Sequence, residues 1–264
     1  LFRSNIDNYK NISFKIVDAS QYIDDLFKGI KFKTNNLWPI TVYYRLLIPI
    51  IMRCYDKVLY LDSDLCICKP IDELFDFNTD KSIAAVVEAQ CVFPDELPEL
   101  KESIDRRLKL INKNNYINSG VILFFIKNIH VENYLEFVVN IIKNVELECF
   151  DQDILSIIFN QSTYILPLRF NIQLHTYPLC LENANNKNRI IIKNALRDPF
   201  ILHFSGIAKP WNNIAVPNSD RFWDYARLSP YYKSILNTYL SCGIKEFNLK
   251  KIYLFKTIYY ASIY

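Results

Sequence analysis

Uninterrupted runs of apolar residues recur along the chain, and stretches with helical spacing of apolar positions separate most of them. Runs of this kind are typical of strands buried on both faces of a sheet. We therefore expect strands at 12–18, 57–61, 83–88, 117–126, 164–170 and 200–204. Helices are expected at 41–52, 97–111, 133–145, 152–159 and 221–239.

This alternation predicts an α/β fold with a Rossmann-like, mainly parallel sheet and helices on both faces. No internal repeat and no linker rich in proline or serine divides the chain, so we expect one domain over 1–240 and a C-terminal helical tail over 241–264. Ligands bind such sheets outside the carboxyl ends of the strands, so the residues that follow each strand are the candidates for function.

Composition narrows the class of protein. Hydrophobic residues make up 51% of the chain and charged residues 22%, as in an ordinary globular protein. The segment 245–264 holds four lysines and one glutamate, and this excess equals the whole net charge of +3. The neutral remainder argues against a nucleic-acid partner. Seven cysteines without a C-x-x-C pair predict neither a disulfide framework nor a zinc site, and indicate a reducing cytoplasm.

Glycine is scarce, and its scarcity excludes two nucleotide-binding devices. The chain has four glycines, at positions 29, 120, 206 and 243, where an average protein of this length has about 18. Neither the dinucleotide fingerprint G-x-G-x-x-G nor a phosphate-binding P-loop can be formed with glycines so far apart. A nucleotide would have to be bound by another device.

The segment 62–64 offers such a device. Asp62 and Asp64 follow the expected strand 57–61 at positions i and i+2, so both carboxylates can project to one side. Two acids this close repel each other unless a cation lies between them, and Mg²⁺ or Mn²⁺ often completes its shell with phosphate oxygens. The alternative is a solvated acidic turn, which is common after a strand.

The segment 203–211 has a complementary chemistry. His203 ends an expected strand, and imidazole suits Mn²⁺ better than Mg²⁺. Gly206 would let the backbone approach a ligand closely, and Lys209 offers a point charge for phosphate. Taken alone, a histidine such as His203 is more often a hydrogen-bonded structural residue than a metal ligand.

Two further segments carry polar groups that suit a sugar. Asn118 opens the strand 117–126, and its amide can bind sugar hydroxyls, although a turn at a strand start is the plain alternative. Asp151 can cap the helix that follows it, which leaves Gln152 and Asp153 in the first turn unexplained. Carboxylates and amides there can stabilise a positively charged sugar transition state.

Taken together and in this order, these segments resemble glycosyltransferase family 8, most closely its bacterial lipopolysaccharide α-galactosyltransferases and α-glucosyltransferases. The resemblance covers roughly residues 12–215. The shared segments are 40–46, 57–64, 116–121, 150–155, 168–171 and 203–211. Each motif is weak alone, but the ordered set is specific because independent chance matches multiply.

The resemblance implies a GT-A fold, a UDP-hexose donor, a saccharide or lipid-linked saccharide acceptor, and transfer with retention. By position, it implies that Mn²⁺, with Mg²⁺ as the alternative, is held by Asp62, Asp64 and His203. The implied donor-binding residues are Arg45, Asp62, Ser63, Asp64, Asn118, Gly206 and Lys209. The implied catalytic residues are Gln152, Asp151 and Asp153. A looser match assigns the acceptor pocket to Glu88, Asn171 and Ser205.

These residues favour one mechanism over another. A bound Mn²⁺ would act as a Lewis acid on the leaving diphosphate, and Lys209 would neutralise the charge that develops there. Gln152 is a poor nucleophile, so we favour front-face attack by the acceptor hydroxyl, with Asp153 kept as the alternative nucleophile.

The N-terminal part departs from the family pattern. No segment before residue 12 matches the strand and turn with which the family binds uracil and ribose. We expect either that about 25 upstream residues are missing or that the chain is a degenerate copy. A carbohydrate-binding protein without turnover, and a metal-dependent phosphohydrolase using Asp62 and Asp64, therefore remain as alternatives.

The tail over 245–264 interleaves its lysines with aromatic residues. This composition suits attachment to an anionic membrane, which predicts peripheral contact with the inner face of the cytoplasmic membrane. A helix packed on the body of the protein is the alternative.

Overall fold

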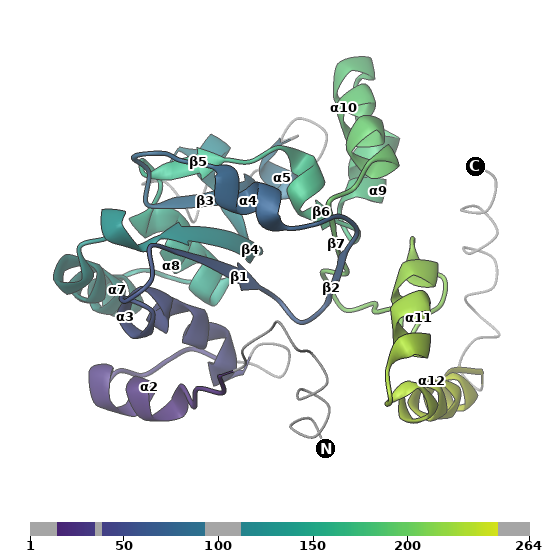
Figure 1. Cartoon of the computed structure of the whole chain (residues 1–264), viewed down its shortest axis with the longest axis horizontal. Coiled ribbons are helices and arrows are strands. Elements are labelled where there is room, and N and C mark those ends of the chain that lie inside the picture. Colours follow the sequence, from purple (N-terminus) through teal and green to yellow (C-terminus); the bar gives the residue numbers. More distant parts are fainter. Residues whose placement is uncertain (1–14, 35–38, 93–111, 248–264) are drawn as a thin grey trace.

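The computed structural model describes residues 15–34, 39–92 and 112–247, which form a mixed α/β structure with two open sheets (Figure 1). Of the elements expected from the sequence, helix 97–111 lies outside these residues, as do positions 12–14 of the first strand. Residues 15–18 of that strand have no regular structure. The strands are β1 Lys57–Leu61, β2 Leu65–Ile67, β3 Ile83–Val87, β4 Ile117–Phe125, β5 Thr163–Ile165, β6 Ile172–Gln173 and β7 Ile201–His203.

The larger sheet has four strands in the order β1-β4-β3-β5. Its central strand β4 is antiparallel to both β1 and β3, and β3 is parallel to β5. In the smaller sheet, ordered β2-β7-β6, β7 is antiparallel to β2 and parallel to β6. The sheets are therefore mixed, and the expectation of a mainly parallel sheet was wrong. An apolar run reports that both faces of a strand are buried, but it carries no information about the direction of its neighbours.

Helices cover both faces of the larger sheet, as predicted. On β4, Ile122 and Phe124 point into one apolar cluster, while Val121, Leu123 and Phe125 point into another. The first cluster includes residues of α2 Ser20–Leu26, the 3₁₀ helix η1 Ile40–Leu47, α7 Val131–Asn144 and α8 Phe150–Ile158. The second includes α4 Asp72–Asp76 and the 3₁₀ helix η4 Leu168–Phe170. Each buried side chain of this size contributes about 1.5–3 kcal/mol, so β4 anchors the core.

Prolines account for three differences from the expected elements. The helix expected at 41–52 is η1 followed by the short helix α3 Ile48–Ile51, which has Pro49 in its first turn. The strand expected at 164–170 ends at Ile165, and Pro167 precedes η4. The helix expected at 221–239 is two helices, α11 Ser219–Leu228 and α12 Tyr232–Phe247, with Pro230 between them. Proline lacks the N–H that a helix or ladder would use.

The remaining helical elements are short or polar. They are α5 Ala89–Val92, η2 Lys113–Asn115, η3 Ile126–Asn128, α9 Tyr177–Asn183 and α10 Asn186–Arg197. Helices α9 and α10 lie beside the smaller sheet, and α11 and α12 lie beyond it (Figure 1).

The C-terminal prediction falls mostly beyond what the structure describes. Within the described ranges, no helix combines the length and the apolar character that a bilayer crossing requires. Helix α12 runs through position 240, where the sequence predicted the end of the main domain. Positions 248–264 of the basic tail lie outside the described residues.

Candidate active site

The two sheets meet at the turn that carries the acidic pair. Asp62 directly follows β1, and its N–H donates to the carbonyl of Gly120 on β4 (2.9 Å). Asp64 directly precedes β2, and its carbonyl accepts from the N–H of Phe204 after β7 (3.0 Å). One short turn therefore connects the sheets, and backbone hydrogen bonds to both fix its position.

Three potential metal ligands converge at this turn, and we call Asp62, Asp64 and His203 the metal corner. Nε2 of His203 lies 3.8 Å from Oδ2 of Asp62 and 3.4 Å from Oδ1 of Asp64. One ligand atom from each of the three residues lies within 4.8 Å of the others. Oxygen and imidazole nitrogen donors suit Mn²⁺. The residues predicted to bind a metal are thus brought together.

The metal corner requires glycine at position 120. A Cβ atom there would overlap Cε1 of His203 and lie 2.9 Å from its Nδ1 and 3.0 Å from Oδ2 of Asp62. The ring of His203 therefore occupies the space that any other side chain on β4 would take. Position 120 lies in the segment 116–121 singled out from the sequence, but the sequence does not reveal this close approach.

Lys209 lies against the metal corner. Its ammonium group contacts Oδ2 of Asp64 and donates to the carbonyl of Phe204 (2.6 Å). Burial raises the pKa of Asp64, but the contacts of its carboxylate with His203 and Lys209 outweigh this effect and hold that pKa well below its ordinary value. A fixed cation thus stands beside the two acids of this turn.

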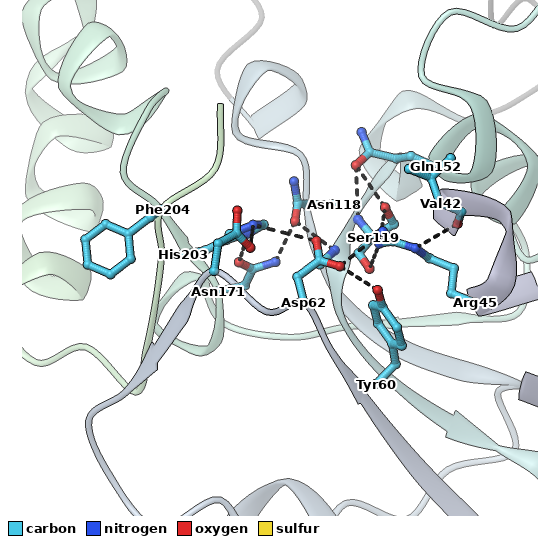
Figure 2. Close-up of polar contacts among 12 residues, drawn as sticks. Val42, Arg45, Tyr60, Asp62, Asn118, Ser119, Gln152, Asn171, His203 and Phe204 are labelled. Carbon is cyan, nitrogen blue, oxygen red and sulfur yellow. Dashed lines mark hydrogen bonds and ion pairs between the residues drawn. The ribbon is translucent and has the colours of Figure 1, made fainter. Parts of the chain in front are cut away.

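Arg45 joins the metal corner to the start of α8 (Figure 2). Its guanidinium lies 3.1 Å from Oδ1 of Asp62 and 3.0 Å from Oδ2 of Asp151. It also donates to the carbonyl of Ser119 (2.7 Å) and lies over the ring of Tyr60, 4.7 Å from its centroid. Burial raises the pKa of Asp151 to about 6, although Arg45 and Ser119 act in the opposite direction.

Gln152 is held from both ends of its amide. Its Oε1 accepts from the N–H of Ser119 (3.0 Å), and its Nε2 donates to Oε2 of Glu88 and to the hydroxyl of Tyr116 (both 3.2 Å). Phe150, two residues before Gln152, has a φ of 39°, which lies in the left-handed region that bulky residues rarely adopt. Strain of this kind is concentrated at functional sites, and here it precedes the two polar residues that face Ser119.

The carboxylate of Asp153 is buried, and the residue is only 1% exposed. One of its oxygens accepts from the hydroxyl of Tyr116 (2.7 Å), and the other accepts from the N–H groups of Glu148 (2.8 Å) and Cys149 (2.9 Å). The structure therefore places this predicted catalytic residue beneath the site, where its carboxylate supports Tyr116 and the turn before α8.

The residues predicted for an acceptor pocket are not gathered on an open surface. Glu88 is buried and accepts from Asn118 (2.9 Å), and burial raises the pKa of Glu88. Asn171 is 0% exposed and lies under His203. The hydroxyl oxygen of Ser205 is buried and has no hydrogen-bond partner among the described residues.

Ser63 and Gly206, which were predicted to bind the donor, both lie on turns that follow strands. Ser63 is exposed between the two acids. Gly206 has a φ of +84°, a backbone conformation that favours glycine. A Cβ atom at this position would also lie 2.7 Å from the ring of His175, so both the backbone and the available space disfavour a larger residue. Tyr60, Tyr116 and Ser119 had no role predicted from sequence. For Tyr60, its position two residues before Asp62 was a usable signal, because side chains at i and i+2 along a strand point to the same side.

Comparison with known proteins gives the family. Residues 2–215 match the glycosyl transferase family 8. A lipopolysaccharide 1,2-glucosyltransferase of Escherichia coli is 29% identical over 206 residues, which is 75% of this chain and 57% of that protein. A lipopolysaccharide 1,3-galactosyltransferase of Salmonella typhimurium is 28% identical over 220 residues, which is 80% of this chain and 61% of that protein. The chain thus spans about three fifths of the length of these relatives.

Solved structures have the same fold. The bifunctional glycosyltransferase WbbM superposes with a TM-score of 0.78 at 23% identity, over 90% of this chain and 43% of that one. The galactosyltransferase LgtC, solved with donor and acceptor sugar analogues, superposes with a TM-score of 0.65 at 23% identity, over 86% of this chain and 80% of that one. These likenesses confirm the predicted GT-A fold. With the family match over most of its length, the chain belongs to glycosyltransferase family 8.

Proposed function

We propose that this chain transfers a hexose, galactose or glucose, from a UDP-sugar to a saccharide acceptor with retention of the anomeric configuration. The observation that carries the proposal is the convergence of Asp62, Asp64 and His203 at the joint between the sheets. Lys209 on one side and Arg45 on the other add two fixed cations beside the same turn. This arrangement suits a diphosphate that leaves with negative charge.

Asp62, Asp64 and His203 would hold a divalent cation, Mn²⁺ or Mg²⁺. The donor set fits, because two carboxylates and an imidazole nitrogen lie within 4.8 Å of one another, and Gly120 has no side chain to crowd them. When bound, the cation supplies Lewis-acid stabilisation of the charge on the diphosphate. Lys209 would stabilise the same negative charge with its ammonium group. Arg45 holds the carboxylate of Asp62 in place beside Asp64 and His203.

We assign the sugar to the side of the site formed by Gln152, Asp151 and Asn118. Gln152 is held by three hydrogen bonds, so its amide can position a sugar without rearranging. Asp153 is buried with both of its oxygens accepting hydrogen bonds, which supports a positioning role for it in place of the nucleophilic one. Attack by the acceptor hydroxyl on the same face as the departing diphosphate is the mechanism we favour.

The relatives support a role in cell-surface glycan synthesis. The similar proteins of E. coli and S. typhimurium are named as lipopolysaccharide glucosyltransferase and galactosyltransferase. We propose a saccharide or lipid-linked saccharide as acceptor, and a cytoplasmic location with the donor pool. Attachment of the basic tail to the membrane stays a prediction from its composition.

The deciding experiment measures UDP released from UDP-galactose and UDP-glucose with and without Mn²⁺, for the wild type, Asp64→Asn and Asp76→Asn. Asp76 is an exposed acid at the end of α4 and serves as the matched control. We expect metal-dependent UDP release by the wild type and Asp76→Asn, and a loss of more than about 100-fold in Asp64→Asn. Sugar binding without UDP release would favour the carbohydrate-binding alternative, and cleavage of the diphosphate would favour the phosphohydrolase.

A further inference from the structure

Two buried asparagines connect His203 to Glu88 in one line of hydrogen bonds, and we call them the amide relay. Nδ1 of His203 lies 3.0 Å from Oδ1 of Asn171, whose Nδ2 donates to Oδ1 of Asn118 (2.8 Å). Nδ2 of Asn118 then donates to Oε2 of Glu88 (2.9 Å). Figure 2 shows the amide of Asn171 between the ring of His203 and Asn118.

The orientation of the first amide follows from a backbone group that can only donate. The N–H of Gly120 lies 3.1 Å from the side chain of Asn118, so the atom facing it must be the oxygen Oδ1. The nitrogen of Asn118 then faces Glu88, where a carboxylate oxygen accepts. The two ends of this amide are thus assigned independently, and they agree.

The second amide follows from the first. An amide oxygen only accepts, so the atom that Asn171 presents to Oδ1 of Asn118 must be its nitrogen. The oxygen of Asn171 is left facing Nδ1 of His203, and it too can only accept. Nδ1 of His203 must therefore carry a hydrogen.

We propose that Asn171 is a positioning residue that fixes His203 as the Nδ1–H tautomer, and that Asn118 and Glu88 hold the amide of Asn171 in the required orientation. A neutral imidazole carries one N–H, so this tautomer leaves the lone pair of Nε2 directed toward Asp62 and Asp64. That lone pair is the one a metal would use. The proposal rests on the metal site proposed above and adds the groups that prepare it.

The Nε2–H tautomer competes with the Nδ1–H tautomer, because Asp64 offers it a hydrogen-bond acceptor. Asn171 is therefore needed to favour the Nδ1–H form. Oδ1 of Asp64 lies 3.4 Å from Nε2 and would accept a hydrogen from it. With the acceptor at Nδ1 removed, this carboxylate favours the Nε2–H form, whose hydrogen occupies the direction of the metal. Asn171 is 0% exposed, so no ligand at the surface can substitute for its oxygen.

The first test reads the tautomer directly by ¹⁵N NMR of the metal-free chain, at a pH where the imidazoles are neutral. The sequence has three histidines, and the variants His130→Gln and His175→Gln assign the other two. The wild type is expected to show Nδ1–H at His203. A wild-type chain with Nε2–H at His203 would overturn the proposal, and this measurement needs no change at Asn171.

The second test compares three variants by the same NMR measurement and by Mn²⁺ titration. Asn171→Leu keeps the volume and loses the acceptor, so we expect Nε2–H at His203 and Mn²⁺ binding weakened about 10- to 100-fold. Asn171→Asp keeps an oxygen that can accept from Nδ1–H, so we expect it to retain the Nδ1–H tautomer and Mn²⁺ binding. Asn160→Leu controls for the loss of any buried asparagine, because the side chain of Asn160 is buried and hydrogen-bonds with the backbone of Asn112.

The outcomes separate this proposal from the proposed function. Wild-type Mn²⁺ affinity and an Nδ1–H tautomer in Asn171→Leu would refute the role of Asn171 and leave the transferase proposal standing. A wild type that binds no Mn²⁺ would refute the metal site, while the tautomer at His203 would still decide whether the amide relay acts as argued.

Discussion

The metal corner and the polar groups behind it use similar residues in different surroundings. The side chains of Asp62 and Asp64 are 22% and 18% exposed and lie against Arg45 and Lys209. Behind them, Glu88, Asn118, Asn171 and Asp153 are buried. We call these four residues, with Tyr116 and Gln152, the inner network. The contrast shows a division of labour, because the accessible carboxylates can meet a ligand while Asn171 and Asp153, which are 0% and 1% exposed, can only orient other residues.

This division makes a general prediction about substitutions. Changes in the metal corner should reduce ligand binding and turnover more than stability, because its charged groups are partly solvated. Changes in the inner network should reduce stability as well, because each would leave a buried polar partner without its hydrogen bond. The predictions that follow are ordered from the largest expected effect to the smallest.

Gly120→Ala should have the largest effect on function. The added methyl group overlaps the ring of His203, so the ring must leave the metal corner. We expect Mn²⁺ affinity and UDP release to fall by more than about 100-fold, with the fold retained by circular dichroism. A variant that turns over normally would show that His203 does not need its present position.

Asp153→Asn tests whether Asp153 is a nucleophile or a buried residue that holds Tyr116 and the turn before α8 in place. Two backbone N–H groups and the hydroxyl of Tyr116 donate to its carboxylate, and an amide can accept from only one side. We expect the free energy of unfolding to fall by about 2–3 kcal/mol, measured by urea denaturation. Turnover per folded molecule should fall modestly, and a complete loss in the folded variant would support the nucleophilic role instead.

The carboxyl group of Asp151 predicts a pH dependence of stability. Its pKa is raised from 3.8 to about 6 in the folded state, because burial penalises its charged form. The folded chain therefore keeps this proton between these two pH values while the unfolded chain releases it. The contribution of Asp151 to stability is present at pH 4 and is lost as the pH rises to about 6, by on the order of 2 kcal/mol.

Asp151→Asn removes the titrating group. Comparing how the free energy of unfolding changes with pH in the variant and the wild type therefore isolates the contribution of Asp151. Urea denaturation between pH 4 and 7 should show the variant gaining stability relative to the wild type as the pH rises, on top of a constant offset from the lost contact with Arg45. Parallel pH profiles for the two chains would contradict the raised pKa.

Ser63→Ala should have the smallest effect. Ser63 is exposed on the turn between the two acids. We expect the free energy of unfolding to change by less than about 0.5 kcal/mol. Turnover with UDP-galactose should change only slightly, and a loss as large as that of Gly120→Ala would mean that the hydroxyl binds the donor.

The metal corner was predictable from sequence, because each of its residues lies at a strand end and strand ends determine where ligands bind. The inner network was not. Asn171 and Asp153 stand in ordered motifs, but a motif does not tell whether a side chain faces the ligand or the core. Asn171 was therefore assigned to an acceptor pocket, whereas its buried position beneath His203 fits an orienting role better.

The fold was predicted in outline for similar reasons. Long apolar runs such as β4 identified the central strands, but the direction of β1 and β3 beside it depends on connections that periodicity does not report. The polar helix α10 was missed, although Asn185 caps it by accepting from the N–H of Asn188 (3.0 Å). An asparagine before a stretch of helical spacing was the available signal.

The most direct measurement of the central claim is an electron paramagnetic resonance titration of Mn²⁺ into the wild type, Asp62→Asn and Asp76→Asn. The account predicts one Mn²⁺ bound per chain by the wild type and by Asp76→Asn, and binding weakened by more than about 100-fold in Asp62→Asn. Equal Mn²⁺ affinity in Asp62→Asn and the wild type would contradict it.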